Sequence, residues 1–137
     1  MIAVIGEALI DLVVDEAGAV VARPGGGPFN TARTLGRLGV ETTFLGRLSS
    51  DRFGRTLRER LAADGVALGV PTPAGRPSTL AVADLGPDGT VRYDFYLSGT
   101  ASAALDYPVL AAALPHGVTA VHAGTLSLVM EPIASAI

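Results

Sequence analysis

The chain has 137 residues, 49% hydrophobic and 17% charged, which is enough for one globular domain with its own core. Its net charge of -3 gives no attraction to nucleic acid or anionic membranes, and the absence of cysteine excludes disulfides, thiolate zinc sites and cysteine nucleophiles. All ten basic residues are arginine, so a P-loop lysine and a Schiff-base lysine are also excluded within these residues.

The first elements alternate between strand and helix patterns. Residues 2–6, IAVIG, form a continuous apolar run that predicts a buried parallel strand. Two short apolar runs around a turn signal predict a small hairpin, a lid-like ribbon, near residues 12–23. A helix is predicted from Pro28, which a first turn tolerates, to a stop at Gly39.

The middle of the chain predicts a second core strand, a capped helix and a second hairpin. The run VETTFLG reads as the strand, and Asp51 is expected to cap a helix that Gly65 ends. A connection rich in proline and glycine, with Pro71, Pro73, Gly75 and Pro77, follows over residues 66–78. The segments STLAVADL and TVRYDFYL flank the turn signal GPDG and predict a β-hairpin.

The last third predicts a short helix in YPVLAAALPHG, a third core strand in VTAVHAG and the opening of a helix in EPIASAI. Strands that alternate with helices predict an α/β fold with a parallel sheet and right-handed crossovers. The two hairpins interrupt that alternation as insertions.

Three consecutive glycines before the helix from Pro28 allow three interpretations of GGGPFN. A tight turn is the simplest one. A dinucleotide fingerprint would need glycine where Asn30 stands, and would directly follow the first strand. The third interpretation is a loop that grips a polyhydroxylated ligand, because bare glycines let backbone groups reach hydroxyls and Asn30 offers a donor and an acceptor.

The chain resembles the N-terminal part of the PfkB, or ribokinase-like, family of carbohydrate kinases. The resemblance lies in GEALIDLV, in GGGPFNTARTLGRLG and in FLGRLSSDRFG, whose glycines and asparagine match the family signature from Gly26 to Gly54. The segment VHAGTLSLVMEP is similar to the fructokinase-like branch. The resemblance covers essentially all of residues 1–137.

The resemblance implies a Rossmann-like parallel sheet flanked by helices, with a small β-sheet lid near residues 12–23 and 78–100. It implies that a sugar lies between the two, with Asp11 accepting hydrogen bonds from its hydroxyls. The full set of implied substrate-binding residues is Asp11, Gly26, Gly27, Asn30, Phe95, Tyr96, Gly124 and Thr125. On this interpretation Gly26 lacks a side chain because the sugar passes over it, and Gly25 is less sensitive.

The family's catalytic aspartate and anion-hole glycines occur in a GAGD-like motif late in the chain, and no such motif occurs here. The resemblance therefore implies a truncated N-terminal part with no catalytic residue of its own. In the intact enzyme it implies ATP, Mg²⁺ and, as a further candidate, a monovalent cation, with transfer of the γ-phosphoryl group to a sugar hydroxyl. The cofactor-binding residues stay unassigned, and no metal site is expected in these residues.

Fructose or a similar neutral sugar is the expected substrate, because Leu97 follows the lid aromatics and the nearest cation in sequence is Arg92. The alternatives are 2-keto-3-deoxygluconate kinase, ribokinase, nucleoside kinase and a non-catalytic sugar-binding remnant. A homodimer through the β lid is a candidate assembly. The chain has no apolar run of the roughly 20 residues that span a bilayer, and its start lacks signal-peptide features. A cytoplasmic protein without nucleic-acid or membrane partners is therefore expected.

Overall fold

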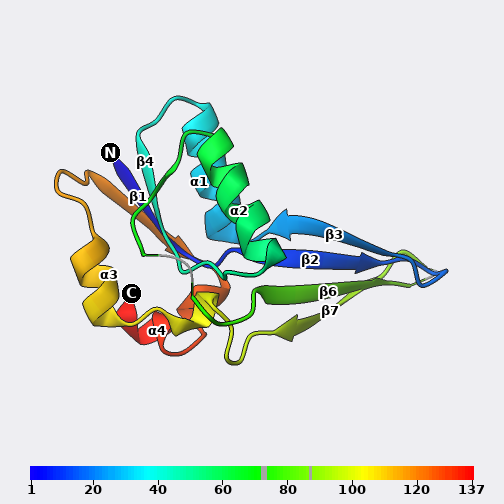
Figure 1. Cartoon of the computed structure of the whole chain (residues 1–137). Helices are drawn as coiled ribbons and strands as arrows, with labels where there is room; N and C mark the ends of the chain where they lie inside the picture. The colour runs from blue at the N-terminus through cyan, green and yellow to red at the C-terminus, as the bar shows by residue number, and fades with distance from the viewer. Residues whose placement is uncertain (72–73, 87) are drawn as a thin grey trace.

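The structure is a computed structural model that describes residues 1–71, 74–86 and 88–137. Figure 1 shows an α/β body from which a ladder of strands extends to one side. Pro73 and Pro87, which the sequence places in a connection and in a hairpin turn, lie outside the described residues.

The body contains a four-stranded parallel sheet in the order β5-β4-β1-β8. Its strands are β1 (Ile2–Gly6), β4 (Thr42–Leu45), β5 (Ala67–Leu68) and β8 (Ala120–Gly124). The three predicted core strands are confirmed. β5 was not predicted, because its two residues lie inside the connection that the sequence assigns to turns.

Two helices cover one face of this sheet, α1 (Gly27–Arg37) and α2 (Arg52–Ala63). Phe29 and Phe44 are fully buried between helix and sheet, in a cluster that also contains Leu57 and Leu61. α1 begins one residue before the predicted Pro28, and Gly39 follows its cap with a φ of 75°. Both predicted helices are confirmed, because their apolar residues recur at the spacing of one helix face.

Asp51 caps α2 as predicted and also joins that helix to the second sheet. Its carboxylate accepts hydrogen bonds from the Gly54 N–H at 2.8 Å and from the Ser78 N–H and hydroxyl, both at 2.8 Å. Burial alone would raise its pKa, but these hydrogen bonds lower the pKa of Asp51 to about 2. The predicted cap is therefore also a tie between α2 and the start of β6.

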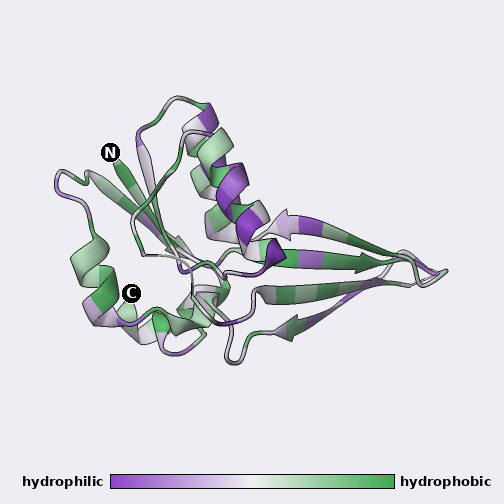
Figure 2. Cartoon of the chain, viewed as in Figure 1, coloured by the Kyte–Doolittle hydropathy of each residue, from purple (hydrophilic) through white to green (hydrophobic). Residues whose placement is uncertain are grey.

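The opposite face of the sheet packs against α3 (Tyr107–Ala113), α4 (Ile133–Ala136) and the short 3₁₀ turns η1 (Ser102–Ala104) and η2 (Leu126–Leu128). Leu105 and Ile133 are fully buried here beside Leu45. The predicted short helix and the helix opening are both confirmed. Figure 2 shows that α3 and α4 are mostly apolar, whereas α1 and α2 carry bands of polar residues.

The two predicted hairpins form one small sheet, as the resemblance implied. Its order is β3-β2-β6-β7, with β2 (Leu9–Val14), β3 (Val20–Gly25), β6 (Thr79–Leu85) and β7 (Val91–Tyr96). Each hairpin is antiparallel, and β2 and β6 pair in parallel between them. The base of the sheet is buried, with Leu9 and Thr79 at 3% and 0% exposure, so the sheet grows out of the body's core.

Candidate functional site

The three glycines, Gly25 to Gly27, lie where three parts of the chain meet. A side chain at Gly25 would collide with the carboxylate of Asp11 on β2. A side chain at Gly27 would come within 2.8 Å of the Thr125 hydroxyl, just after β8. Gly26 has a φ of 108°, and a side chain there would lie 2.8 Å from the Glu7 carbonyl oxygen. The glycines therefore let β2, the end of β1 and the end of β8 converge on the start of α1.

This geometry provides a second explanation for Gly26, which does not require a ligand. Its positive φ and the nearby Glu7 carbonyl account for the missing side chain without any ligand. Gly25 is also not the insensitive neighbour that was expected, because a β-carbon there would displace Asp11. Contact between a sugar and the loop stays a prediction, while the need for close approach at all three glycines has an intramolecular cause.

Glu7, which follows β1, binds the segment after β8 through its buried carboxylate. The Thr125 and Ser127 hydroxyls donate to it at 2.6 Å each, and the Ser127 and Thr125 N–H groups donate at 3.0 and 3.1 Å. Glu7 itself is 0% exposed. We call the contacts of Glu7 with Thr125 and Ser127 the Glu7 clamp.

The Glu7 clamp keeps the carboxylate charged. Burial alone would raise its pKa, but hydrogen bonds from Ser127 and Thr125 outweigh burial and lower the pKa of Glu7. Because Thr125 also faces Gly27, the clamp fixes the end of β8 against the start of α1. Sequence reasoning missed Glu7, since its partners lie far away along the chain and the order of residues gives no sign of them.

Asp11 is the opposite case, a partly buried carboxylate to which no hydrogen bond is donated within the described ranges 1–71, 74–86 and 88–137. Burial raises the pKa of Asp11. Its neighbours across the sheet are Arg23 on β3 and Ala81 on β6. Residues in register across a sheet share a face, so Arg23 lies on the same face as Asp11.

Arg23 corrects the expectation about the nearest cation. Arg92 instead pairs with Asp84 at 3.7 Å towards the far end of β6 and β7, on the face that does not carry Asp11. Only the pairing of β2 with β3 shows that Arg23 stands opposite Asp11. The absence of a nearby cation is therefore no longer an argument for a neutral sugar.

The two predicted aromatic residues lie on different faces of the second sheet. Phe95 is in register with Ala81, and therefore lies on the face of Asp11, whereas Tyr96 is in register with Leu80 on the other face. Phe95 stacks on Tyr93 with ring centroids 5.8 Å apart and is 46% exposed. Phe95 and Asp11 share a face, and the structure does not bring Tyr96 to it.

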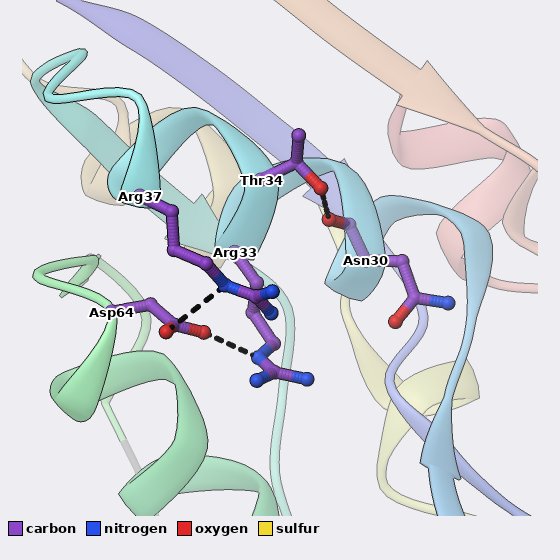
Figure 3. A network of polar contacts seen from close by, with 5 residues as sticks. All are labelled: Asn30, Arg33, Thr34, Arg37 and Asp64. Carbon is purple, nitrogen blue, oxygen red and sulfur yellow. Dashed lines mark hydrogen bonds and ion pairs between the residues drawn. The ribbon is translucent and has the colours of Figure 1, made fainter.

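Asn30 lies in the first turn of α1, exposed to solvent. Figure 3 shows its amide pointing away from the ion pairs that Arg33 and Arg37 form with Asp64. Those ion pairs, at 2.6 and 3.1 Å, join α1 to the end of α2. The backbone carbonyl of Asn30 accepts a hydrogen bond from Thr34 at 2.9 Å, and α1 has no side-chain cap. The side-chain amide of Asn30 is therefore available to a ligand.

The structure brings Asp11, Gly26, Gly27, Gly124 and Thr125 to one junction, with Asn30 one turn into the helix. A hollow of about 540 Å³ lies away from this junction, at the tips of the hairpins beside Asp15 and Leu85.

Within the described residues, no group of three histidine or acidic side chains gathers where a metal ion could be held. None of the helices in those residues has the length and apolar character needed to cross a membrane.

Comparison with known proteins decides the family. The sequence profile described as pfkB family carbohydrate kinase matches residues 1–133. The chain belongs to the PfkB family of carbohydrate kinases. It is 38% identical over 139 aligned positions to Fructokinase-1 of Oryza sativa subsp. japonica, an alignment that covers 96% of this chain and 43% of the rice protein.

Solved structures agree with that assignment. The crystal structure of a fructokinase from Xylella fastidiosa matches with a TM-score of 0.84 and 28% identity, over 98% of this PfkB chain and 45% of that protein. A fructokinase from Vibrio cholerae, solved with fructose, ADP and calcium, is 24% identical with a TM-score of 0.75 and shows the fold alone. The chain thus spans less than half the length of the relatives it matches, and it has the ribokinase-like α/β fold of the corresponding part.

Proposed function

We propose that this chain is the sugar-binding part of an ATP-dependent fructokinase-like enzyme. The observation that carries the proposal is Asp11, a carboxylate that burial keeps at a raised pKa while no described residue donates to it. Such a group costs folding free energy unless a ligand supplies donors. The family match supports a sugar as that ligand, since a carboxylate accepts hydrogen bonds from two adjacent hydroxyls.

The residues around Asp11 would orient the sugar. The amide of Asn30 can donate and accept, and the positive end of the α1 dipole favours ligand oxygens nearby. Gly26, Gly27, Gly124 and Thr125 would form the wall at the junction, with Phe95 on the adjoining sheet face. The Glu7 clamp would hold that wall in place. In this proposal the second sheet acts as a lid over the sugar.

Fructose is the proposed substrate, because the rice relative and the Xylella fastidiosa structure are both fructokinases. Arg23 supports an alternative substrate, a sugar acid. A cation on the face of Asp11 would suit a sugar acid, such as 2-keto-3-deoxygluconate. Competition between fructose and a sugar acid for the same site would separate the two substrates.

ATP and Mg²⁺ belong to the proposed activity of the intact kinase. The Xylella fastidiosa fructokinase has been solved with ATP, and a Vibrio cholerae double mutant with fructose, ADP and potassium. The described residues contain no acidic cluster for a divalent ion, and the residues that would bind ATP stay unassigned. We therefore assign no step of phosphoryl transfer to residues of this chain.

The test is to measure fructose binding and fructose-dependent ADP formation with the purified 137-residue chain. We expect binding without ADP formation, because the base and the anion hole are absent from these residues. ADP formation by a sample of verified mass would refute the proposal that this chain binds the sugar without transferring the phosphoryl group. A sample that binds neither fructose nor a sugar acid would refute the sugar site.

A homodimer through the second sheet stays a proposal for the assembly. Val21, Tyr93 and Phe95 lie on one face of that sheet, each about half exposed, and a second copy could cover them. Sedimentation of the wild type beside Tyr93→Asp would test this, with a monomeric wild type counting against it.

A further inference from the structure

A small polar hollow lies just past the carboxyl end of β4, where the connections to β6 and from β7 reach the body. It has a volume of about 260 Å³. Its lining includes Arg47, two residues after β4, and Arg76, in the connection that leads to β6. Parts of η1 and the segment before α4 complete its wall. Ligands of open α/β sheets bind at the carboxyl ends of the strands, so the hollow lies on the ligand-binding side of the body sheet.

Arg47 carries the one buried side-chain polar atom in residues 1–71, 74–86 and 88–137 that lacks a hydrogen-bond partner. That atom is its Nε, whose N–H group donates to no acceptor in the structure. Buried donors are almost always paired, and an unpaired one costs folding free energy. A guanidinium that lines a hollow with an unpaired N–H therefore has room for an acceptor from outside the chain.

Arg76 adds a second cation to the same hollow. It is exposed, whereas Arg47 is half-buried. Among the described residues, neither arginine takes part in an ion pair. Guanidinium groups bind phosphate and carboxylate oxygens through paired N–H donors. Two positive charges match a dianion, so the pair favours a phosphate over a single carboxylate.

Two carboxylates also line the hollow, and each is already hydrogen-bonded to a neighbouring helix. Asp106 accepts from the Val109 N–H at 3.1 Å, and Glu131 accepts from the Ser135 hydroxyl at 2.9 Å. Both carboxylates are exposed, so solvent screens their repulsion of an anion. Their remaining acceptor positions suit hydroxyl donors. The lining therefore favours a phosphate that is attached to a hydroxylated molecule, as in a sugar phosphate.

We propose that this hollow binds a phosphate dianion through Arg47 and Arg76. The phosphate comes either from a sugar phosphate or from free inorganic phosphate, and the same two guanidiniums serve both. This inference goes beyond sugar binding at Asp11, and it assigns a second ligand to a different set of residues.

The hollow and the sugar junction are neighbours, with η1 as a common wall. On the junction side, the Ser102 hydroxyl donates to the Ala8 carbonyl at 2.9 Å, and Ala8 lies against the Gly26 backbone. The next two residues of η1, Ala103 and Ala104, line the hollow. A phosphate bound to the arginines would thus lie beside the sugar site without occupying it.

The experiment is calorimetric titration of the purified chain in a low-salt buffer at about pH 8, where phosphate is a dianion. One titration uses inorganic phosphate and the other uses fructose 6-phosphate. We expect one phosphate per chain. Tighter binding of the sugar phosphate would support the proposal and add the hydroxyl contacts, whereas tighter binding of inorganic phosphate would support it with free phosphate as the ligand. Absence of binding by both probes up to about 10 mM would overturn it.

Three arginine variants locate the site. Arg47→Gln and Arg76→Gln should each weaken binding of inorganic phosphate at least about tenfold, because each removes one charged donor group. Arg52→Gln, at an exposed arginine of α2, should leave the affinity unchanged. Arg76→Gln should also melt like the wild type, since Arg76 is exposed, so a loss of binding in this variant cannot come from unfolding. Equal losses from all three variants would show attraction to positive charge in general and would overturn the proposal.

Asp11→Ala separates the hollow from the sugar junction. Its affinity for inorganic phosphate should stay within about twofold of the wild type, because Asp11 belongs to the junction and salt screens charges at a distance. A larger change would place the phosphate at the junction and would overturn the proposal. Since this comparison uses no sugar, failure of the sugar site and failure of the phosphate site give different results.

Discussion

Glu7 and Asp11 stand four residues apart in the chain, and their surroundings shift their pKa values in opposite directions. Glu7 lies at the end of the body sheet, fully buried, and receives hydrogen bonds that lower its pKa. Asp11 lies on the second sheet, only partly buried, and burial without a described donor raises its pKa. The first carboxylate stabilises the fold, while the second costs the fold free energy and is available to a ligand. Burial alone therefore does not mark a functional carboxylate, because the supply of donors decides its role.

Replacing Glu7 tests the stabilising side of this comparison and carries the largest expected effect. Glu7→Gln would place an amide donor against hydroxyl and N–H donors, and would lose charge-assisted hydrogen bonds. We expect the free energy of unfolding to fall by about 3 kcal/mol or more, since several buried donors lose their acceptor. Urea unfolding measures the change, and Glu41→Gln, at an exposed glutamate, is the control. A loss as small as that of the control would show that the Glu7 clamp contributes little.

Replacing Asp11 tests whether this carboxylate binds the sugar. Asp11→Ala should weaken fructose binding by roughly 10- to 150-fold, which corresponds to about 1.5–3 kcal/mol for a charged acceptor. Its unfolding free energy should change by no more than about 0.5 kcal/mol, as for other positions outside buried networks. Calorimetric titration with fructose and urea unfolding give the two numbers. Unchanged fructose affinity would end the assignment of Asp11 to the sugar.

Gly26 is close to both acidic residues. A side chain on it would lie 2.8 Å from the carbonyl oxygen of Glu7, and a side chain on the preceding residue, Gly25, would collide with the carboxylate of Asp11. Gly26→Ala should lower the unfolding free energy by about 1–2 kcal/mol, since alanine is strained at positive φ. Fructose affinity of the folded fraction should change less than in Asp11→Ala. The control is Gly75→Ala, where φ is ordinary and no atom lies within 4 Å. A normal melting temperature combined with a large loss of affinity would restore the earlier explanation, in which the sugar passes over Gly26.

The sequence was a good guide to local structure and a poor guide to what meets across the fold. Periodicity and turn residues predicted the helices at Pro28 and Asp51 and the three core strands. They could not predict the parallel pairing of β2 with β6, because that register depends on packing between distant hairpins. The same limit hid Glu7 and Arg23, whose roles come from partners in other elements. The glycines were correctly interpreted as positions of close approach, but the groups that approach two of them are Asp11 and Thr125.

The smallest expected effect is that of Asp11 on stability, which is opposite in sign to that of Glu7. The pKa of Asp11 is raised in the folded state, so its charge costs stability above that pKa and the cost disappears as the pH falls and the group protonates. Asp11→Asn should therefore stabilise the chain near neutral pH, by no more than about 0.5 kcal/mol because solvent still screens the carboxylate.

The pKa of Glu7 is lowered, so its contribution to stability is present above the unfolded pKa and is lost as the pH falls through the folded value. Urea unfolding at acidic and at neutral pH measures both effects. The gain in unfolding free energy from Asp11→Asn should shrink to zero in acid, and the loss of unfolding free energy from Glu7→Gln should also become smaller there. If Asp11→Asn destabilises the chain near neutral pH, Asp11 has a donor in solution and belongs with Glu7 as a structural carboxylate.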